Sequence, residues 1–181
     1  MKQTGRIAIL GQGFMGAAIA AHLLEAGHSL IVWNRTADKC APARDLGASV
    51  ARTPEEAVAA ADMIICIIAA IEDLVPIFTA SPGLLEGKDV VCLITATPAQ
   101  VRRIAGLVAA EGGHFLNGQI QCFPSGIGSP QSVIVCGGDP GVWERRGAIV
   151  RSLAGGSVHA DAAPDFPNVM DTAVMGCFLL V

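Results

Sequence analysis

The residues of this 181-residue chain with the clearest chemical potential are three glycines near its N-terminus. Gly11-Gln12-Gly13-Phe14-Met15-Gly16 has the spacing GxGxxG and lies between an apolar run and a segment with helical periodicity. In that setting the first glycine permits a tight turn, the second lets the backbone approach a pyrophosphate, and Gly16 lets helix and strand pack closely. The helix N-terminus adds amide donors and a positive dipole end. The pattern therefore predicts a dinucleotide-binding loop.

A second polar group follows the next apolar run. NAD-selective sites place Asp or Glu at this point, to accept a hydrogen bond from the ribose 2′-hydroxyl. This sequence instead has Asn34-Arg35-Thr36, with Lys39 about one turn further on. A guanidinium, a hydroxyl and an ammonium bind a 2′-phosphate, which a carboxylate would repel. The sequence thus predicts NADPH in preference to NADH; the alternative is that Arg35 and Lys39 form only a solvated helix start.

These residues need a scaffold, and the hydrophobic pattern predicts alternating strands and helices. Strands are expected at 6–10, 29–33, 48–51, 62–68, 90–94, 114–117, 132–136 and 157–160, with helices at 14–26, 37–46, from 53, 98–110, 143–153 and 168–181. Apolar runs without interruption, such as 63–68 within the strand expected at 62–68, are typical of a parallel sheet covered on both faces. The predicted fold class is α/β, a Rossmann-type doubly wound and mainly parallel sheet.

Composition excludes several classes of protein. Hydrophobic residues make up 52% of the chain and charged residues 15%, which is incompatible with a charged disordered tail. The net charge of −4 argues against a nucleic-acid partner, because binding phosphates needs a basic face. A membrane-spanning helix needs about 18 consecutive apolar residues, and no uninterrupted apolar stretch of this sequence is that long. We therefore expect no membrane partner. The apolar run at the N-terminus is broken by the glycine loop and is not read as a signal peptide.

Neither the cysteines nor the histidines have the spacing of a metal site or a disulfide framework. The six cysteines are Cys40, Cys66, Cys92, Cys122, Cys136 and Cys177, with no CxxC pair among them. Four of them lie in apolar runs, so they are interpreted as reduced packing residues. We therefore expect no metal and a cytoplasmic location.

Beyond the glycine loop, Glu25-Ala26-Gly27-His28 and Val32-Trp33-Asn34-Arg35-Thr36 resemble the N-terminal domain of NADPH-dependent imine reductases. These enzymes belong to the β-hydroxyacid dehydrogenase and 6-phosphogluconate dehydrogenase superfamily. The likeness continues through 115–120 and 124–128 to Val169-Met170-Asp171. It implies an NADPH-binding Rossmann domain over 1–163 and the start of a long interdomain helix over 164–181. It also implies that the C-terminal helical domain of the family is absent from this chain.

The same resemblance assigns site residues. It matches Asn34, Arg35, Thr36 and Lys39 to 2′-phosphate positions, Ile67, Ile68 and Ala69 to backbone contacts near the pyrophosphate and ribose, and Thr95 to a position beside the nicotinamide ribose. It matches Asp171 to the position where imine reductases place an Asp or Tyr that donates or positions a proton. The sequence departs from the family where a usual aspartate is Asn117 and where small apolar residues are replaced by Gln119, Gln121 and Cys122.

Asp171 distinguishes two enzyme classes. β-Hydroxyacid dehydrogenases have a lysine there, whose ammonium stabilises negative charge on oxygen during alcohol oxidation. A carboxylate instead favours a protonated iminium, which an ammonium would repel. We therefore expect an NADPH-dependent oxidoreductase that transfers hydride to an imine or iminium carbon. The alternatives are an alcohol or aldehyde oxidoreductase of the same superfamily and a non-catalytic NADPH-binding module. Asp171 could also serve only the helix dipole in a first turn, and Asp165 is read as a cap or turn residue.

The final helical segment is apolar and has no stop signal. Val174, Phe178, Leu179 and Val181 would form an exposed apolar stripe on a monomer. We therefore expect a homodimer that forms through this helix. In the family that it resembles, the active site lies between the cofactor domain of one subunit and the helical domain of its partner. The expected ligand besides NADPH is a small-molecule imine or carbonyl substrate.

Overall fold

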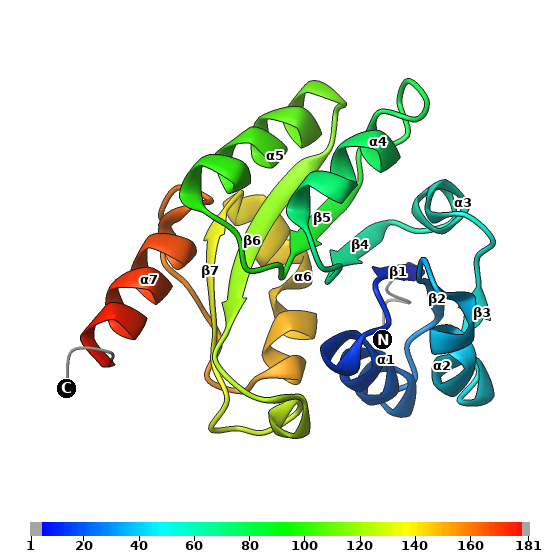
Figure 1. Cartoon of the computed structure of the whole chain (residues 1–181), viewed down its shortest axis with the longest axis horizontal. Helices are drawn as coiled ribbons and strands as arrows, with labels where there is room; N and C mark the ends of the chain where they lie inside the picture. Colours follow the sequence, from blue (N-terminus) through cyan, green and yellow to red (C-terminus); the bar gives the residue numbers. More distant parts are fainter. Residues whose placement is uncertain (1–4, 179–181) are drawn as a thin grey trace.

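The structure, a computed structural model, describes residues 5–178 and contains one eight-stranded sheet (Figure 1). The strands are β1 Ile7–Leu10, β2 Leu30–Trp33, β3 Ser49–Val50, β4 Met63–Cys66, β5 Asp89–Cys92, β6 His114–Ile120, β7 Ile134–Gly138 and β8 Val158–His159. They are ordered β3-β2-β1-β4-β5-β6-β7-β8, and every neighbouring pair is parallel except β6 and β7. The predicted mainly parallel, Rossmann-type α/β fold is confirmed.

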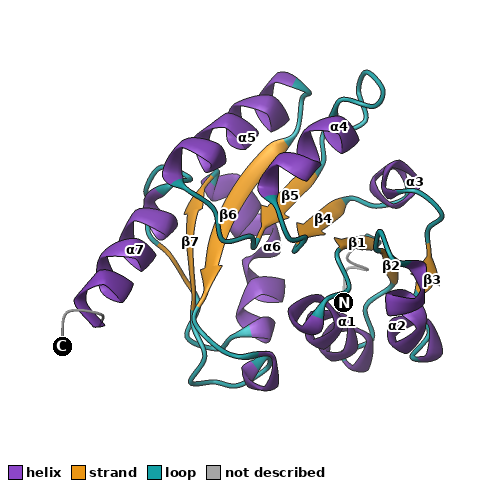
Figure 2. Ribbon diagram, viewed as in Figure 1, coloured by secondary structure: helices purple, strands orange, loops and turns teal. Residues whose placement is uncertain are grey.

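Helices cover both faces of this sheet (Figure 2). They are α1 Phe14–Glu25, α2 Ala41–Asp45, α3 Pro54–Ala59, α4 Leu74–Phe78, α5 Pro98–Ala110, α6 Pro140–Leu153 and α7 Phe166–Phe178, with short 3-10 turns η1 Ala37–Cys40, η2 Ile71–Asp73 and η3 Pro124–Gly126. Buried side chains of α1, α2 and α6 pack on one face, and those of α3, α4 and α5 pack on the other. This two-sided cover is what the continuous apolar strands predicted.

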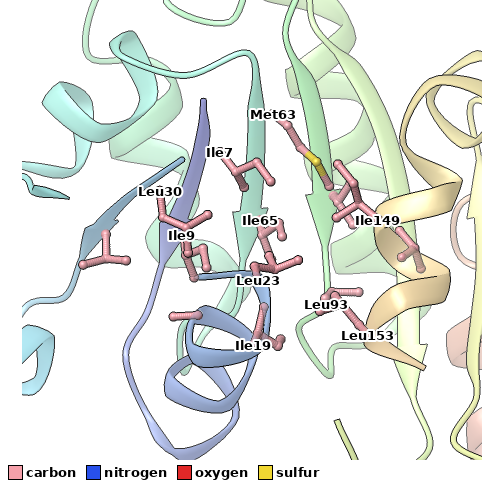
Figure 3. Packing of buried hydrophobic residues seen from close by; sticks show 14 of the residues in the cluster. Ile7, Ile9, Ile19, Leu23, Leu30, Met63, Ile65, Leu93, Ile149 and Leu153 are labelled. Carbon is pink, nitrogen blue, oxygen red and sulfur yellow. The ribbon is translucent and has the colours of Figure 1, made fainter. Parts of the chain in front are cut away.

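The alternation of side chains along β1 explains how one strand serves two cores. Ile7 and Ile9 belong to the cluster beneath α1 and α6, whereas Ala8 and Leu10 belong to the cluster on the opposite face. All four side chains are fully buried. In Figure 3, Leu23 of α1 is seen close to Ile9 on the first of these faces. A strand at the centre of the sheet therefore has no face free for polar residues.

Most predicted elements differ from the structure by a few residues at their ends, and two differ in a way that has a clear physical reason. The expected helix at 37–46 is the turn η1 followed by α2, because Pro42 has no N–H to extend a helical ladder back to Asp38. The carbonyl of Asp38 accepts from the N–H of Ala41 instead, which is a 3-10 contact. The strand expected to end at Asn117 continues to Ile120 as β6, since its second half pairs with β7.

The last helix, α7, packs against β6, β7 and α5 and lies beside β7 in Figure 1. It begins at Phe166, two residues before the predicted start. Val174 of the predicted apolar stripe is 40% exposed. The side chain of Phe178, and Leu179 and Val181 altogether, lie outside the part that the structure describes. The homodimer through this helix stays a prediction.

Candidate functional site

Three loops meet at the carboxyl ends of the central parallel strands. β1 lies between β2 and β4, so the chain moves away from β1 in opposite directions, and a crevice opens at such a point in a doubly wound sheet. Two neighbouring pockets of about 470 and 450 Å³ occupy this edge and share Gly13, Ile67, Ile68 and Ala69. We call them together the groove, and name its two ends the Arg35 half and the Thr95 half.

The three glycines of the loop are needed for different structural reasons. A Cβ at Gly11, whose φ is +111°, would lie 2.5 Å from the carbonyl oxygen of Ile67. A Cβ at Gly16 would lie 2.1 Å from the carbonyl oxygen of Gly11. A Cβ at Gly13 would meet no atom within 4 Å, although this residue lines both halves of the groove. The packing of the protein thus explains Gly11 and Gly16, whereas Gly13 borders space open to an external group.

The Arg35 half carries the predicted phosphate-binding cations. Arg35, Thr36 and Lys39 are exposed and line the same pocket. Among residues 5–178 neither Arg35 nor Lys39 forms an ion pair. Two cations without a protein counter-ion can neutralise one anionic ligand group between them.

Asn34 and Gln12 hold the loops together, and Asn34 also lines the Arg35 half of the groove. The Asn34 Oδ1 accepts from the backbone N–H of Gln12 at 2.9 Å, and its Nδ2 donates to the carbonyl of Thr36 at 3.0 Å. The Gln12 side chain is buried, and its Nε2 donates to the carbonyl of Gly11 at 3.0 Å. Gln12 is also absent from the lining of both halves. These two predicted residues shape the site through the backbone that they tie together.

The Thr95 half is lined by the start of α1 and by the loop after β5. Phe14, Met15 and Gly16 of α1 line it together with Thr95. The Phe14 side chain is 91% exposed. Sequence reasoning missed several residues of ordinary chemistry that complete the two halves: Leu93, Ile94, Ile120 and Pro124 here, and Trp33, Asp73, Pro76 and Ile77 in the Arg35 half. Only their place at the ends of β-strands, in α4 and in the turns η2 and η3 brings them to the groove.

Asp171 is the sixth residue of α7, which places it beyond the first turn of that helix. The alternative that it serves only the helix dipole in a first turn is therefore wrong. Its Oδ1 accepts from the Nε2 of Gln121 at 2.8 Å, and its side chain is half-buried. Asp171 does not line either half of the groove. Its partner Gln121, however, directly follows Ile120, which lines the Thr95 half.

Asp165 stands immediately before α7, where the sequence predicted a cap or turn residue. Its backbone carbonyl accepts from the N–H groups of Asn168 and Val169, both at 3.1 Å. Its carboxylate forms an ion pair with Arg102 of α5. Asp165 therefore joins the start of α7 to the neighbouring helix.

The described cysteines fit their interpretation as packing residues. Cys40, Cys66, Cys92 and Cys136 are free and buried, whereas Cys122 is half-buried. Burial raises the pKa of the Cys92 and Cys136 thiols to about 12, and it raises that of Cys66 as well. The Cys177 side chain lies outside the described set. Within residues 5–178 no three metal-ligating side chains are grouped to hold an ion, and no helix is long and apolar enough to cross a membrane.

Residues 6–163 match the family model described as the NAD binding domain of 6-phosphogluconate dehydrogenase. The chain belongs to this family. The match spans the glycine loop, all eight strands and both halves of the groove. It therefore confirms the predicted class of cofactor, a nicotinamide dinucleotide, for this domain.

Two curated relatives indicate different settings for the same domain. The chain is 37% identical over 133 residues to the NADPH-dependent reductive aminase of Aspergillus oryzae, covering 74% of this chain and 45% of that protein. It is 36% identical over 146 residues to the cytokine-like nuclear factor N-PAC of Xenopus tropicalis, covering 77% of this chain and 27% of that protein. The chain thus spans less than half the length of either relative.

Solved structures agree with the fold over nearly the whole chain. A reductive aminase of Aspergillus terreus, in complex with NADPH4, cyclohexanone and allyl amine, superposes with a TM-score of 0.90 at 30% identity, covering 97% of this chain and 61% of that one. An imine reductase of Myxococcus stipitatus in complex with NADP+ gives 0.91 at 26% identity, covering 96% and 61%. The resemblance to the N-terminal cofactor domain of imine reductases is confirmed.

Proposed function

We propose that the groove binds NADPH, with its 2′-phosphate in the Arg35 half and its nicotinamide in the Thr95 half. One observation carries this proposal: Arg35 and Lys39 line the same pocket and form no ion pair within residues 5–178, and that pocket meets open space at Gly13. The carboxylate of Asp73 also lines this pocket but pairs with neither cation. The donor set fits a dianionic phosphate, since a guanidinium and an ammonium stand beside the hydroxyl of Thr36.

The remaining groups of NADPH follow from this orientation. The pyrophosphate would lie over Gly13 at the N-terminus of α1, where backbone N–H groups and the helix dipole favour negative charge. The backbone of 67–69 would contact the pyrophosphate and the adjoining ribose, and Thr95 would stand beside the nicotinamide ribose. Gly13 and residues 67–69 line both halves, which supports one continuous ligand across the groove.

We further infer that this protein reduces an imine or iminium carbon. When bound, NADPH supplies the hydride. The carboxylate of Asp171 would attract the iminium cation and position or deliver the proton that the product nitrogen carries. Similarity to a reductive aminase and to an imine reductase supports this class of reaction. A carbonyl substrate of an alcohol-type oxidoreductase is disfavoured, because a lysine at this position would suit oxygen and Asp171 does not.

A second candidate function is an NADPH-binding module without turnover. Its support is the 36% identity over 146 residues to N-PAC, whose name describes a nuclear factor and not a reductase, at nearly the same level as the 37% identity over 133 residues to the reductive aminase. The two candidates share the NADPH site and differ in chemistry. Turnover of a small cyclic imine with NADPH by this chain would favour the enzyme, and NADPH binding without turnover of imines or carbonyls would favour the module.

The proposed phosphate site is tested by Arg35→Ala, titrated with NADPH and with NADH by calorimetry. Loss of charge-assisted hydrogen bonds to the phosphate should weaken NADPH by about 1.5–3 kcal/mol, roughly 10- to 150-fold. NADH should be unaffected, because it has no 2′-phosphate. Arg44→Ala is the matched control, since Arg44 is exposed, pairs with Asp45 and does not line the groove. Equal weakening of both cofactors by Arg35→Ala would contradict the phosphate assignment.

A further inference from the structure

Three amide side chains lie along β6 and just after it, and none of them lines the groove. Asn117 and Gln119 of β6, and Gln121 directly after it, stand at alternate positions, so they share one face of the extended chain. Each binds a different partner: Asn117 Nδ2 donates to the Pro164 carbonyl at 2.8 Å and to Asn168 Oδ1 at 2.6 Å, Gln119 Nε2 to the Ile94 carbonyl at 3.3 Å, and Gln121 Nε2 to Asp171 Oδ1 at 2.8 Å.

Two amides clamp the loop that carries Thr95. The loop 93–97 runs between β5 and α5 without regular secondary structure. On one side of Thr95, the Ile94 carbonyl accepts from Gln119. On the other side, the Ala96 carbonyl accepts from the Nδ2 of Asn168 at 2.7 Å. Gln119 and Asn168 are 4% and 3% exposed, so water does not readily replace either donor.

Asn168 connects this clamp to the helix that carries Asp171. Its Oδ1 accepts from Asn117, and its Nδ2 donates to Ala96, so it joins β6, α7 and the Thr95 loop. Asp171 lies three residues further along α7, on the same helical face, and is held by Gln121. Loss of the Asn168 side chain would leave the half-buried Ala96 carbonyl, next to Thr95, without its donor.

We propose that Asn168 is a positioning residue for the nicotinamide end of the groove. It holds Thr95 in register with the cofactor and aligns the helix that carries Asp171. The inference rests on the proposed NADPH site and deepens it, because it assigns the geometry of the Thr95 half to a residue of α7. Asn168 touches neither half of the groove itself.

The test compares two nucleotides in calorimetric titrations of the Asn168→Ala variant. NADPH spans both halves, whereas adenosine 2′,5′-bisphosphate occupies the Arg35 half alone. We expect the Kd of NADPH to rise about 3- to 10-fold and that of the bisphosphate to stay within about twofold. Gln119→Leu removes the other clamp, at Ile94, and should give the same pattern. Arg102→Gln is the control, because it frees Asp165 at the start of α7 and leaves both carbonyls of the loop in place.

The outcomes separate this inference from the proposed function. Equal weakening of both nucleotides would mean that Asn168 only supports the fold, and unchanged NADPH binding would mean that the clamp is irrelevant; either overturns the inference. Wild-type protein that binds the bisphosphate and NADPH equally well would also overturn it, since the Thr95 half would then contribute nothing. Wild-type protein that binds neither nucleotide would refute the proposed NADPH site and this inference with it. If Asn168→Ala does not fold, Gln119→Leu decides alone.

Discussion

Alanine substitutions at Gly13 and Gly16 should separate ligand binding from folding within a single loop. The two glycines lie three residues apart, at the start of α1, and both line the Thr95 half of the groove. The space around them differs. A Cβ at Gly16 would lie 2.1 Å from the Gly11 carbonyl oxygen and 3.0 Å from the Ile67 Cγ2, whereas one at Gly13 would meet nothing within 4 Å.

These distances set the expected stabilities. Gly16→Ala must displace backbone, and overpacking of this kind costs about 1–3 kcal/mol, partly offset by up to about 1 kcal/mol of helix propensity. Gly13 has φ −74° and ψ −172°, a conformation that alanine adopts without strain. The free energy of unfolding of Gly13→Ala should therefore stay within about 1 kcal/mol of the wild type, since the lower chain entropy of alanine offsets its poorer capping.

In contrast to its stability, the NADPH affinity of Gly13→Ala should fall. The methyl group of Gly13→Ala would occupy the space through which the backbone approaches the pyrophosphate. Loss of those charge-assisted hydrogen bonds corresponds to about 1.5–3 kcal/mol, roughly 10- to 150-fold in Kd. Urea unfolding measures the first quantity and calorimetric titration the second. The reasoning is refuted if Gly13→Ala binds NADPH as the wild type does, or if it loses as much stability as Gly16→Ala.

Two further predictions concern groups outside the groove. Burial raises the pKa of Asp89. Hydrogen bonds and charges from Arg145 and Arg146 of α6 outweigh this effect and hold that pKa below its usual value. Its stabilisation is therefore fully present above the unfolded pKa of about 3.9 and is lost as the pH falls through the lower folded pKa. Asp89→Asn should cost roughly 1.5–3 kcal/mol in urea unfolding at pH 7, and this cost should shrink steadily as the pH is lowered below about 3.9. A cost that does not change with pH would contradict the pairing. Among the described thiols, Cys122 should react first with iodoacetamide at pH 8, because it is only half-buried whereas burial raises the pKa of Cys66 and Cys92. Mass spectrometry follows the labelling, and labelling of Cys66 and Cys92 in the folded protein at a similar rate would contradict this prediction.

The order of elements and the class of ligand could be predicted because both depend on local patterns. A strand covered on both faces must be apolar at every position, so β1 and β4 are recognisable in the sequence without knowledge of their neighbours. The demands on Gly11 and Gly16 arise within one strand–turn–helix unit, and the spacing GxGxxG records them. Arg35 follows the next strand, so its place at the same edge of a parallel sheet follows from the topology alone.

Tertiary structure alone decided how the polar residues of β6 are used. Asn117 and Gln119 resemble the end of a strand when only local polarity is considered, and the predicted strand therefore stopped too early. Their amides are in fact buried, because partners from distant parts of the chain satisfy them: Asn168 lies 51 residues from Asn117, and Ile94 lies 25 residues from Gln119.

The same distinction applies to the candidate catalytic group. The residue type at Asp171 suggested a chemistry, but only the packing of α7 on β6 brings it to Gln121, 50 residues away. Local hydrophobic periodicity and turn chemistry act over a few residues and are written in the sequence. Hydrogen bonds between distant segments depend on which elements the fold makes neighbours, and they become visible only in three dimensions.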